Sequence, residues 1–497
     1  MSFEFIDNNT AIDRTARKRI RTHAAIGKNA NRTLTRPSRV AALKANTATP
    51  FYTPETITQR AHEDTTTSSP TDTEVVEVER PLTDGLLFPV PVPARSRRLV
   101  KEALFFFCNV RHSPELDGAL QSPDLVASIW VRFFFVDEAY FHCSIATSIL
   151  CSKNLISESA QAMHHIARTY RIIQQRLQSG KEATSDMTIA ILVAMSQYER
   201  LQGRYERGYV HVQGLRRMIE LRGGIRQFDR ESAGVAQKVL RADLEYALQL
   251  GGTTLLGLEG IEFLRSSQRL LTDHEGDNSE VDIFLKKHIG SDLRNVFAET
   301  KDLAALLNNA DAGYRQKLGS TEFHNSILLL GHCLLQINPL CSSIDHDERL
   351  AFGMSALEDV IHLGLLAFLV TFLSGLNHRV ADQPLLAQKL RSAIENMLKI
   401  IESGKEKRPG NSVLLWALFI GAVVVFKPSD DEWLIKTTSA TIKALGLSSW
   451  DDIKQVLVGF PWVHALHDRA STKLCHTQNS RELHTNNIKF LVNKCDD

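Results

Sequence analysis

The chain has 497 residues, of which 43% are hydrophobic and 23% charged, and its formal net charge at pH 7 is +1. These proportions are those of an ordinary globular protein with enough apolar residues for a sizeable core. A net charge this close to zero excludes a strong field over the whole molecule. Any attraction to nucleic acid or to a membrane surface must therefore come from a local patch.

Residues 1–44 form a basic N-terminal arm that contains such a patch. Between Asp13 and Lys44 the chain carries ten lysines and arginines against one acid, Asp13 itself. The densest part of the arm consists of Arg17, Lys18, Arg19 and Arg21. This density is typical of a nuclear-import signal or of a tail that contacts phosphates, and a solvated tail without a specific partner stays open as the third interpretation.

Residues 45–96 read as a disordered linker. They contain a Thr/Ser run over 65–69 and acids at Glu74, Glu77 and Glu79, and seven prolines lie between residues 45 and 98. Such a segment buries too little apolar area to offset the entropy of ordering it. We expect disorder here, and a polar tail at 475–497.

The seven cysteines lie far apart in the sequence. The closest pairs, Cys143 with Cys151 and Cys333 with Cys341, are eight residues apart. A zinc cluster needs thiolates about three residues apart on one turn, so these 497 residues offer no such site and we expect no bound metal and no cofactor. Unclustered cysteines predict free, reduced thiols inside the cell. The chain also starts without a basic region followed by an apolar core, so we expect no secretory signal.

From residue 97 to residue 474 the apolar residues recur with helical spacing, and alternation typical of strands is absent. We expect an all-α array of about a dozen helices, and no membrane span, because the longest apolar run (361–376) is shorter than the ~20 residues that a bilayer needs. The expected helices span 97–110, 124–151, 157–177, 186–201, 205–222, 230–250, 292–307, 323–336, 347–376, 385–402, 412–426, 431–445 and 451–460.

The stretch 203–225 sits near the middle of this array. Val212, Leu215 and Ile219 fall on one helix face, and Gly223 and Gly224 follow as a stop signal that tolerates left-handed backbone. Gly214 lies inside the helix, where glycine usually marks a close helix crossing. His211 is interpreted as a neutral imidazole hydrogen-bonded across a crossing, with an effector contact as the alternative.

The last part of the helical region, 411–466, is rich in tryptophan. It contains Trp416, Trp433, Trp450 and Trp462, about one for each expected helix or helix end. Large rings at this spacing predict a closing subdomain with a shared core, in which each indole N–H needs a partner.

Two of these stretches resemble a known family. The residues that carry the first match are His211, Gly214, Leu215, Met218, Leu221, Arg222, Gly223 and Gly224. The second match consists of the Trp416 helix, Trp433 and the Ser449–Trp450 helix start. Both are similar to the fungal-specific transcription factor domain, the helical regulatory part of zinc-cluster transcription factors, and here the resemblance comes without the zinc cluster. It implies a helical regulatory domain over 97–474 and a role in transcription.

Motifs for catalysis are missing from the sequence. The sequence lacks the motif of a phosphate-binding loop, the glycine motif of dinucleotide-binding proteins, the HExxH motif of zinc proteases and the GxSxG motif of serine hydrolases. We therefore expect no catalytic residues. His164 and His165 are adjacent on a helix and point about 100° apart, so they do not form a ligand pair. The acids 430–432 read as a helix start.

These observations predict a nuclear regulator of transcription, on a metabolic or secondary-metabolite pathway by the resemblance. Without its own zinc head it would act through transcription factors or coactivators, and the arm would supply import and non-specific nucleic-acid contact. The alternative is a cytosolic helical protein or enzyme whose apolar helices around 361–376 enclose a small hydrophobic molecule.

Overall fold

The computed structural model describes residues 88–92, 97–109, 113–121, 125–151, 155–267, 279–341, 354–373, 382–402, 408–427 and 431–472. Contacts divide the chain into two units, Met1–Glu79 and Arg80–Asp497, and every described residue belongs to the second. The predicted basic arm, most of the linker and the polar tail lie outside the described residues.

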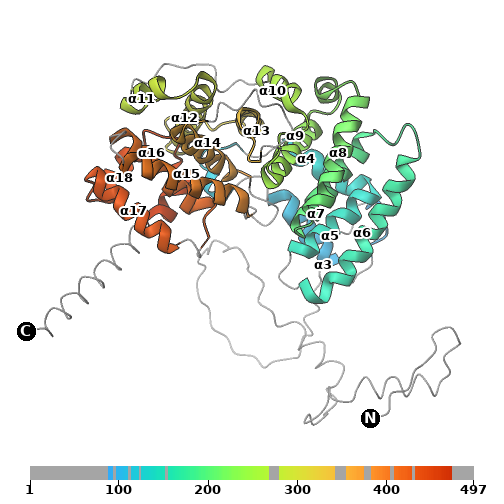
Figure 1. Cartoon of the computed structure of the whole chain (residues 1–497). Helices are drawn as coiled ribbons and strands as arrows, with labels where there is room; N and C mark the ends of the chain where they lie inside the picture. Colours follow the sequence, from blue (N-terminus) through green and yellow to red (C-terminus); the bar gives the residue numbers. More distant parts are fainter. Residues whose placement is uncertain are drawn as a thin grey trace, which may run out of the picture. The chain divides into compact units, whose positions relative to one another are not determined.

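The described residues are helical, as expected, and contain no β-strand (Figure 1). The helices are α3 (Arg97–Asn109), α4 (Leu125–Val136), α5 (Glu138–Cys151), α6 (Leu155–Leu177), α7 (Asp186–Leu201), α8 (Tyr205–Leu221), α9 (Ile225–Leu250), α10 (Gly257–Ser266), α11 (Glu280–His288), α12 (Ser291–Asp311), α13 (Ser320–Ile337), α14 (Ala356–Val370), α15 (Pro384–Glu402), α16 (Arg408–Val424), α17 (Asp431–Leu445) and α18 (Trp450–Leu457), with a short 3₁₀ turn, η2, at Pro114–Leu116. An isolated parallel bridge joins Leu120 to Leu318.

The helix count exceeds the expected dozen, and Asp137 explains one of the additional helices. The segment 124–151 was expected to be one helix, but it breaks at Asp137 into α4 and α5. The Asp137 carboxylate accepts a hydrogen bond from the backbone N–H of Tyr140 at 2.8 Å, which satisfies a free donor of the first turn of α5. An ion pair of 2.7 Å with Arg176 holds the same carboxylate in place. Asp137 therefore acts as a helix cap within an apolar run.

Helices α10 and α11 were not expected, and local sequence signals argue against α10. Gly257 and Gly260 lie in α10 and lower its helix propensity. A methyl group on Gly260 would lie 3.2 Å from the Leu240 side chain and 3.6 Å from His332, so glycine lets α10 approach α9 and α13 closely. The start of α11 carries a cap that was missed, since Ser279 accepts from the N–H of Asp282.

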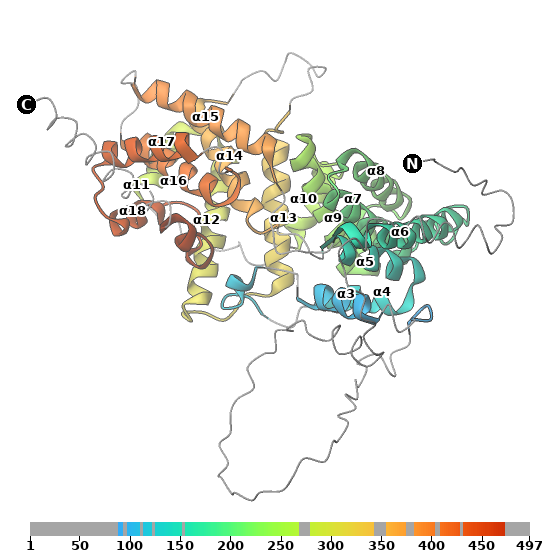
Figure 2. The ribbon, with the colours of Figure 1, turned by 90° about the horizontal axis from the view of Figure 1, so that it is seen from below.

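Helix α13 connects the two sides of the helical unit. It contacts α9 and α10 on one side and α12 and α14 on the other. In two views at right angles, α5 to α8 lie beyond α9 and α10, and α15 to α18 lie on the opposite side (Figures 1 and 2). The pairs α5–α6 and α7–α8 pack as neighbours.

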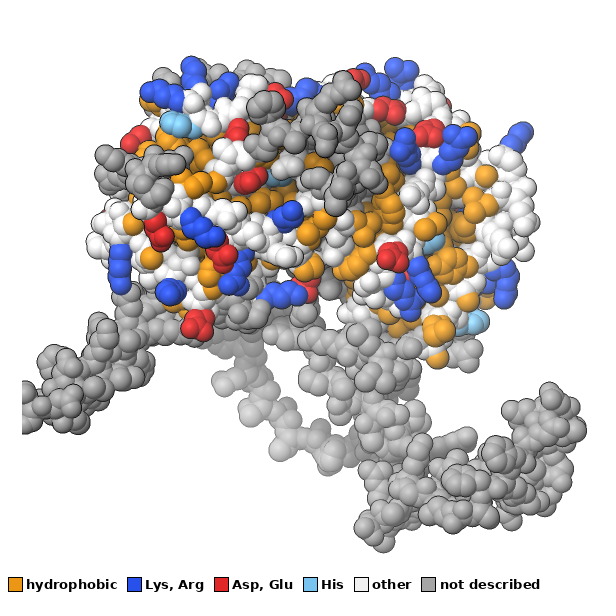
Figure 3. All heavy atoms as spheres, in the orientation of Figure 1, with side chains coloured by type: hydrophobic (Ala, Val, Ile, Leu, Met, Phe, Trp, Pro, Cys, Tyr) orange, Lys and Arg blue, Asp and Glu red, His pale blue; other side chains and the backbone are white. Residues whose placement is uncertain are grey.

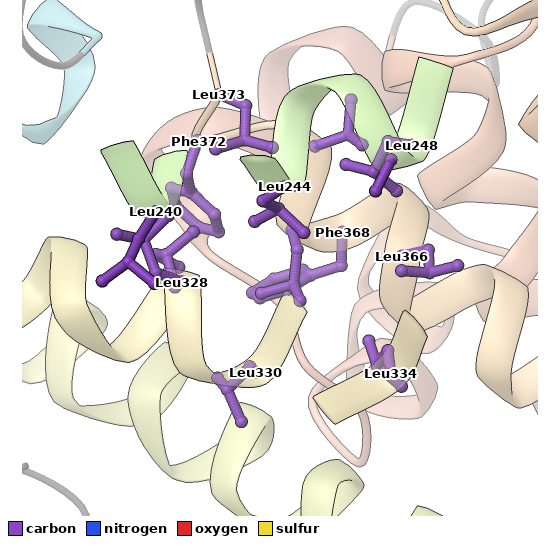
Figure 4. Close-up of a cluster of buried hydrophobic side chains, with 14 of the residues drawn as sticks. Leu240, Leu244, Leu248, Leu328, Leu330, Leu334, Leu366, Phe368, Phe372 and Leu373 are labelled. Atoms are coloured by element: carbon purple, nitrogen blue, oxygen red, sulfur yellow. The ribbon is translucent and has the colours of Figure 1, made fainter. Parts of the chain in front are cut away.

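The core at this junction is built from leucine and phenylalanine. Leu240 and Leu244 of α9, Leu328 of α13 and Phe368 of α14 are all buried and lie close to one another (Figure 4). Burying each such side chain contributes roughly 1.5–3 kcal/mol relative to exposure. A methyl group on Gly331 would lie 2.7 Å from Leu244, so α9 and α13 approach closely.

The surface carries mixed charge. On the face that Figure 3 shows, basic and acidic side chains are interspersed, with apolar side chains between them. This pattern agrees with the net charge of +1. None of the helices that the structure describes is both long enough and apolar enough to span a bilayer. The apolar run 361–376 instead contributes to α14, whose residues from Val360 to Val370 are buried in the core.

Candidate functional site

The turn after α8 has the geometry that its two glycines predict. Gly223 and Gly224 have φ values of 85° and 90°, which favour glycine strongly. The N–H of Gly224 donates to the carbonyl of Ile219 at 3.0 Å, and the N–H of Gly223 donates to that of Glu220 at 3.1 Å. This pair of bonds is a Schellman motif, and it satisfies two carbonyls at the end of the helix.

Arg222 turns this helix end into a junction of three helices. Its guanidinium donates to the carbonyl of Thr184 at 2.9 Å and forms an ion pair of 3.0 Å with Asp186, the first residue of α7. A second ion pair joins it to Glu231 of α9, and the ring of Phe228 lies 5.0 Å beneath the charge. The planar fork of arginine suits two carboxylates at once. The LRGG part of the signature thus fixes α7, α8 and α9 relative to one another.

His211 and Leu215 face inward from α8. Leu215 is fully buried. The His211 ring centroid lies 6.2 Å from that of Tyr170 on α6, and none of the described residues forms a hydrogen bond with His211. Burial lowers the pKa of His211, although Glu199 acts in the opposite direction, so the imidazole is neutral at pH 7. His211 therefore lies at a helix crossing as predicted, but the expected hydrogen bond is replaced by a ring contact.

The expectation that Gly214 marks a close helix crossing is wrong. A methyl group built on Gly214 meets no atom within 4 Å. The close crossing is at Gly208, where the same methyl group would lie 1.6 Å from the hydroxyl oxygen of Tyr246 on α9. Both glycines lie in α8, and local sequence cannot distinguish them, since only the position of α9 decides which one is in contact.

The tryptophans of the second match lie on α16, α17 and α18. Trp416 is fully buried, stacks on Phe460 with ring centroids 5.4 Å apart, and donates its N–H to the Pro461 carbonyl at 3.0 Å. Trp450 opens α18 and lies 6.0 Å from Phe419. The predicted N–H partner is confirmed for Trp416. The capping box at this helix start joins Ser449 and Asp452.

A buried charge cluster between α7 and α9 escaped sequence reasoning. The fully buried carboxylate of Glu245 pairs with Arg200 at 3.3 Å and Arg241 at 2.9 Å, and accepts from Gln197 at 2.8 Å. Burial acts to raise the pKa of Glu245, but the two guanidinium groups lower it overall. Burying a charged carboxylate costs desolvation free energy, which the two ion pairs and the hydrogen bond from Gln197 offset. Each of these residues reads as an ordinary surface residue in the sequence.

A cavity of about 560 Å³ lies between α3, α5, α6 and the segment 88–92. His142, His164 and His165 lie in its wall, and Nδ1 of His142 is 2.8 Å from Nδ1 of His165. The contact between His142 and His165 joins α5 to α6. The prediction that His164 and His165 do not pair with each other did not concern this contact. Among the described residues, no group of three or more His, Cys, Asp or Glu could hold a metal ion.

The alternative of a ligand enclosed around 361–376 fits the structure poorly. The side chains of α14 fill the core, and the space beside Leu373 measures about 10 Å³, room for a single water molecule. The described part of this run packs against α13, α15 and α16, and the 560 Å³ cavity lies between other helices.

The sequence profile described as the fungal specific transcription factor domain matches residues 116–458. The chain belongs to this family. The match contains α4 to α18 in full, including the α8 turn, Trp416 and Trp450, which confirms the resemblance. The family is one of fungal transcription regulators. No curated protein and no solved structure matches the chain.

Proposed function

We propose that the protein is a nuclear regulator of transcription that works through partner proteins. The observation that carries this proposal is the family match over 116–458, together with the α8 signature inside it. Within the 497 residues the closest cysteines are eight apart, which leaves no zinc-cluster spacing for reading bases. Contact with a DNA-bound transcription factor or with a coactivator then brings the helical unit to its target genes, which we place in a metabolic or secondary-metabolite pathway by family resemblance.

The basic arm has two roles in this proposal. Arg17, Lys18, Arg19 and Arg21 form the import signal. The same charges give non-specific, salt-sensitive contact with DNA phosphates, because each neutralised phosphate releases a counterion. The interspersed charges on the helical unit support this division, since a neutral body needs a separate basic segment for both tasks.

Localisation tests the import role. A fluorescent fusion of the full chain with the four arm residues Arg17, Lys18, Arg19 and Arg21 changed to alanine should leave the nucleus. The matched control removes four exposed charges from the helical unit, Lys181, Lys286, Lys287 and Arg315, and should remain nuclear. An unchanged distribution of the arm variant would overturn the assignment.

Binding to DNA tests the partner role. The purified full chain should bind a labelled duplex without preference over scrambled competitors, and its affinity should fall steeply with salt. Removing the four arm charges should reduce the slope of log K against log salt by up to about one per charge. Selection of one duplex over scrambled competitors at physiological salt would show that the protein reads bases itself.

A further inference from the structure

The cavity between α3, α5 and α6 has the size and walls of a small-molecule site. Its volume of about 560 Å³ lies within the range of ligand pockets in proteins, roughly 300–1,000 Å³. Val92, Val100, Phe141 and Ile145 supply apolar wall. None of the lining residues that the structure describes is a Lys, Arg, Asp or Glu. The site therefore favours an uncharged, mainly apolar ligand.

The polar part of the wall consists of Gln161 and three histidines, of which His142 and His165 contact each other. Burial lowers the pKa of His142, and burial together with the other two imidazoles lowers that of His165 to about 4. With both rings neutral at pH 7, a contact of 2.8 Å between their Nδ1 atoms requires that one ring donates and the other accepts.

Glu138 decides which ring donates. Its Oε1 atom lies 3.8 Å from Nε2 of His142, and Arg168 forms an ion pair of 2.8 Å with the same oxygen. A proton on Nε2 of His142 is attracted to this carboxylate, whereas a lone pair there would be repelled. Nδ1 of His142 is then the acceptor, and His165 donates from its own Nδ1.

This arrangement leaves Nε2 of His165 as a free acceptor in the cavity wall. Its lone pair has no partner among the described residues, and His165 lines the cavity. A ligand that fills the apolar space and offers a hydrogen-bond donor would complete the chain that runs from Glu138 through both histidines.

We propose that this cavity binds an uncharged aromatic or aliphatic alcohol whose hydroxyl group donates to Nε2 of His165 while its apolar body packs against Phe141 and Ile145. Binding is a property of the helical unit and does not depend on the basic arm. If the proposed function holds, the alcohol is an effector of the regulator.

Three probes that share the naphthalene ring system test the chemistry on the full-length protein. Naphthol carries the donor, methoxynaphthalene lacks it and naphthoate adds a charge. In titration calorimetry, naphthol should bind saturably and about tenfold more tightly than its methyl ether, because the ether leaves the acceptor unpaired. Naphthoate should bind more weakly than both. Equal affinity for naphthol and the ether, tighter binding of naphthoate, or no saturable binding of naphthol below about 1 mM would overturn the proposal.

Two variants locate the site. Val92→Trp fills the cavity from its rim, where the side chain is only half-buried, and should weaken naphthol binding at least tenfold. His165→Phe removes the acceptor and should make naphthol and its ether bind equally. The matched control is Val210→Trp on the exposed face of α8, which should bind as the wild type does. Unchanged binding by a folded Val92→Trp would place the probe elsewhere and overturn the proposal.

This test is separate from that of the proposed function. The arm variant with four alanines should bind naphthol normally even though its localisation changes. A protein that is nuclear but binds no naphthol would refute only the ligand site, and a protein that binds naphthol in the cytosol would refute only the nuclear role.

Discussion

The hydroxyl group of Tyr246 occupies the space that a side chain at Gly208 would need. It donates to the carbonyl of Ser196 at 2.6 Å, so α7, α8 and α9 meet at this one group. A methyl group on Gly208 would lie 1.6 Å from the hydroxyl oxygen and 2.5 Å from the ring. The crossing of α8 over α9 therefore requires glycine at position 208.

Gly208→Ala should destabilise the protein by roughly 1–3 kcal/mol, because Tyr246 must move and its bond to Ser196 is lost. Gly214→Ala lies in the same helix and meets no atom within 4 Å, so it should stabilise by up to about 1 kcal/mol through helix propensity. Urea unfolding of the two variants measures the difference. Similar effects of the two changes would contradict the assigned crossing.

Arg222 should contribute more to stability than its position at a helix end suggests. Arg222→Ala removes two ion pairs, a bond to the Thr184 carbonyl and the Phe228 contact, and should cost about 1–2 kcal/mol after allowance for the partly exposed carboxylates.

The matched control for this change is Arg226→Ala. Arg226 is only four residues away but forms a single exposed pair of 3.6 Å with Glu262, and its loss should cost less than about 0.5 kcal/mol. Thermal unfolding compares the two variants, and equal losses would mean that Arg222 does not join the three helices.

Buried histidines should make the fold sensitive to acid. Burial lowers the pKa of His362 to about 4 and that of His467 to about 3, and the adjacent Asp468 only partly offsets the shift at His467. In the unfolded chain both titrate near their ordinary value of about 6.5, so below that pH the unfolded state binds more protons. The two neutral imidazoles make their full contribution to the free energy of unfolding above about pH 6.5. This contribution is lost as the pH falls towards 4, at up to about 1.4 kcal/mol per pH unit for each histidine.

Chemical denaturation between pH 8 and pH 4 measures this loss. His362→Gln keeps a donor for the Leu334 carbonyl, which His362 contacts at 2.9 Å, and should flatten the curve below pH 6.5. His288→Gln is the control, because that histidine is exposed, and it should leave the curve unchanged. A variant curve parallel to that of the wild type would show that His362 is not the titrating group.

Trp416 should be the most sensitive of the four C-terminal tryptophans. Trp416→Phe removes the donor to Pro461, leaves a gap against Phe460 and should cost about 2–4 kcal/mol. Trp433 is half-buried and packs against Arg391 at 4.7 Å, so Trp433→Phe should cost less than about 1 kcal/mol. Denaturant midpoints distinguish them, and a larger loss at Trp433 would contradict this ranking.

Local contacts made much of the fold predictable. The all-α class followed from apolar spacing, and the double-glycine stop at Gly223 was confirmed. The N-caps that the structure shows at Ser185 and Ser449 are equally local. A cap or a Schellman turn joins groups only a few residues apart, so neighbouring residues in the sequence are enough to predict it. The break at Asp137 is of this kind too, but an apolar run on both sides concealed it.

Other features depend on which helices become neighbours. Gly208 rather than Gly214 marks the crossing because the Tyr246 side chain of α9 lies against it. His142 contacts His165 because α5 packs on α6. The sequence by itself determined where helices form and where they end, since those choices rest on backbone propensity and short-range hydrogen bonds. Only the tertiary structure decided which glycine is indispensable and where a cavity opens, because both depend on side chains brought together by packing from positions 23 or more residues apart.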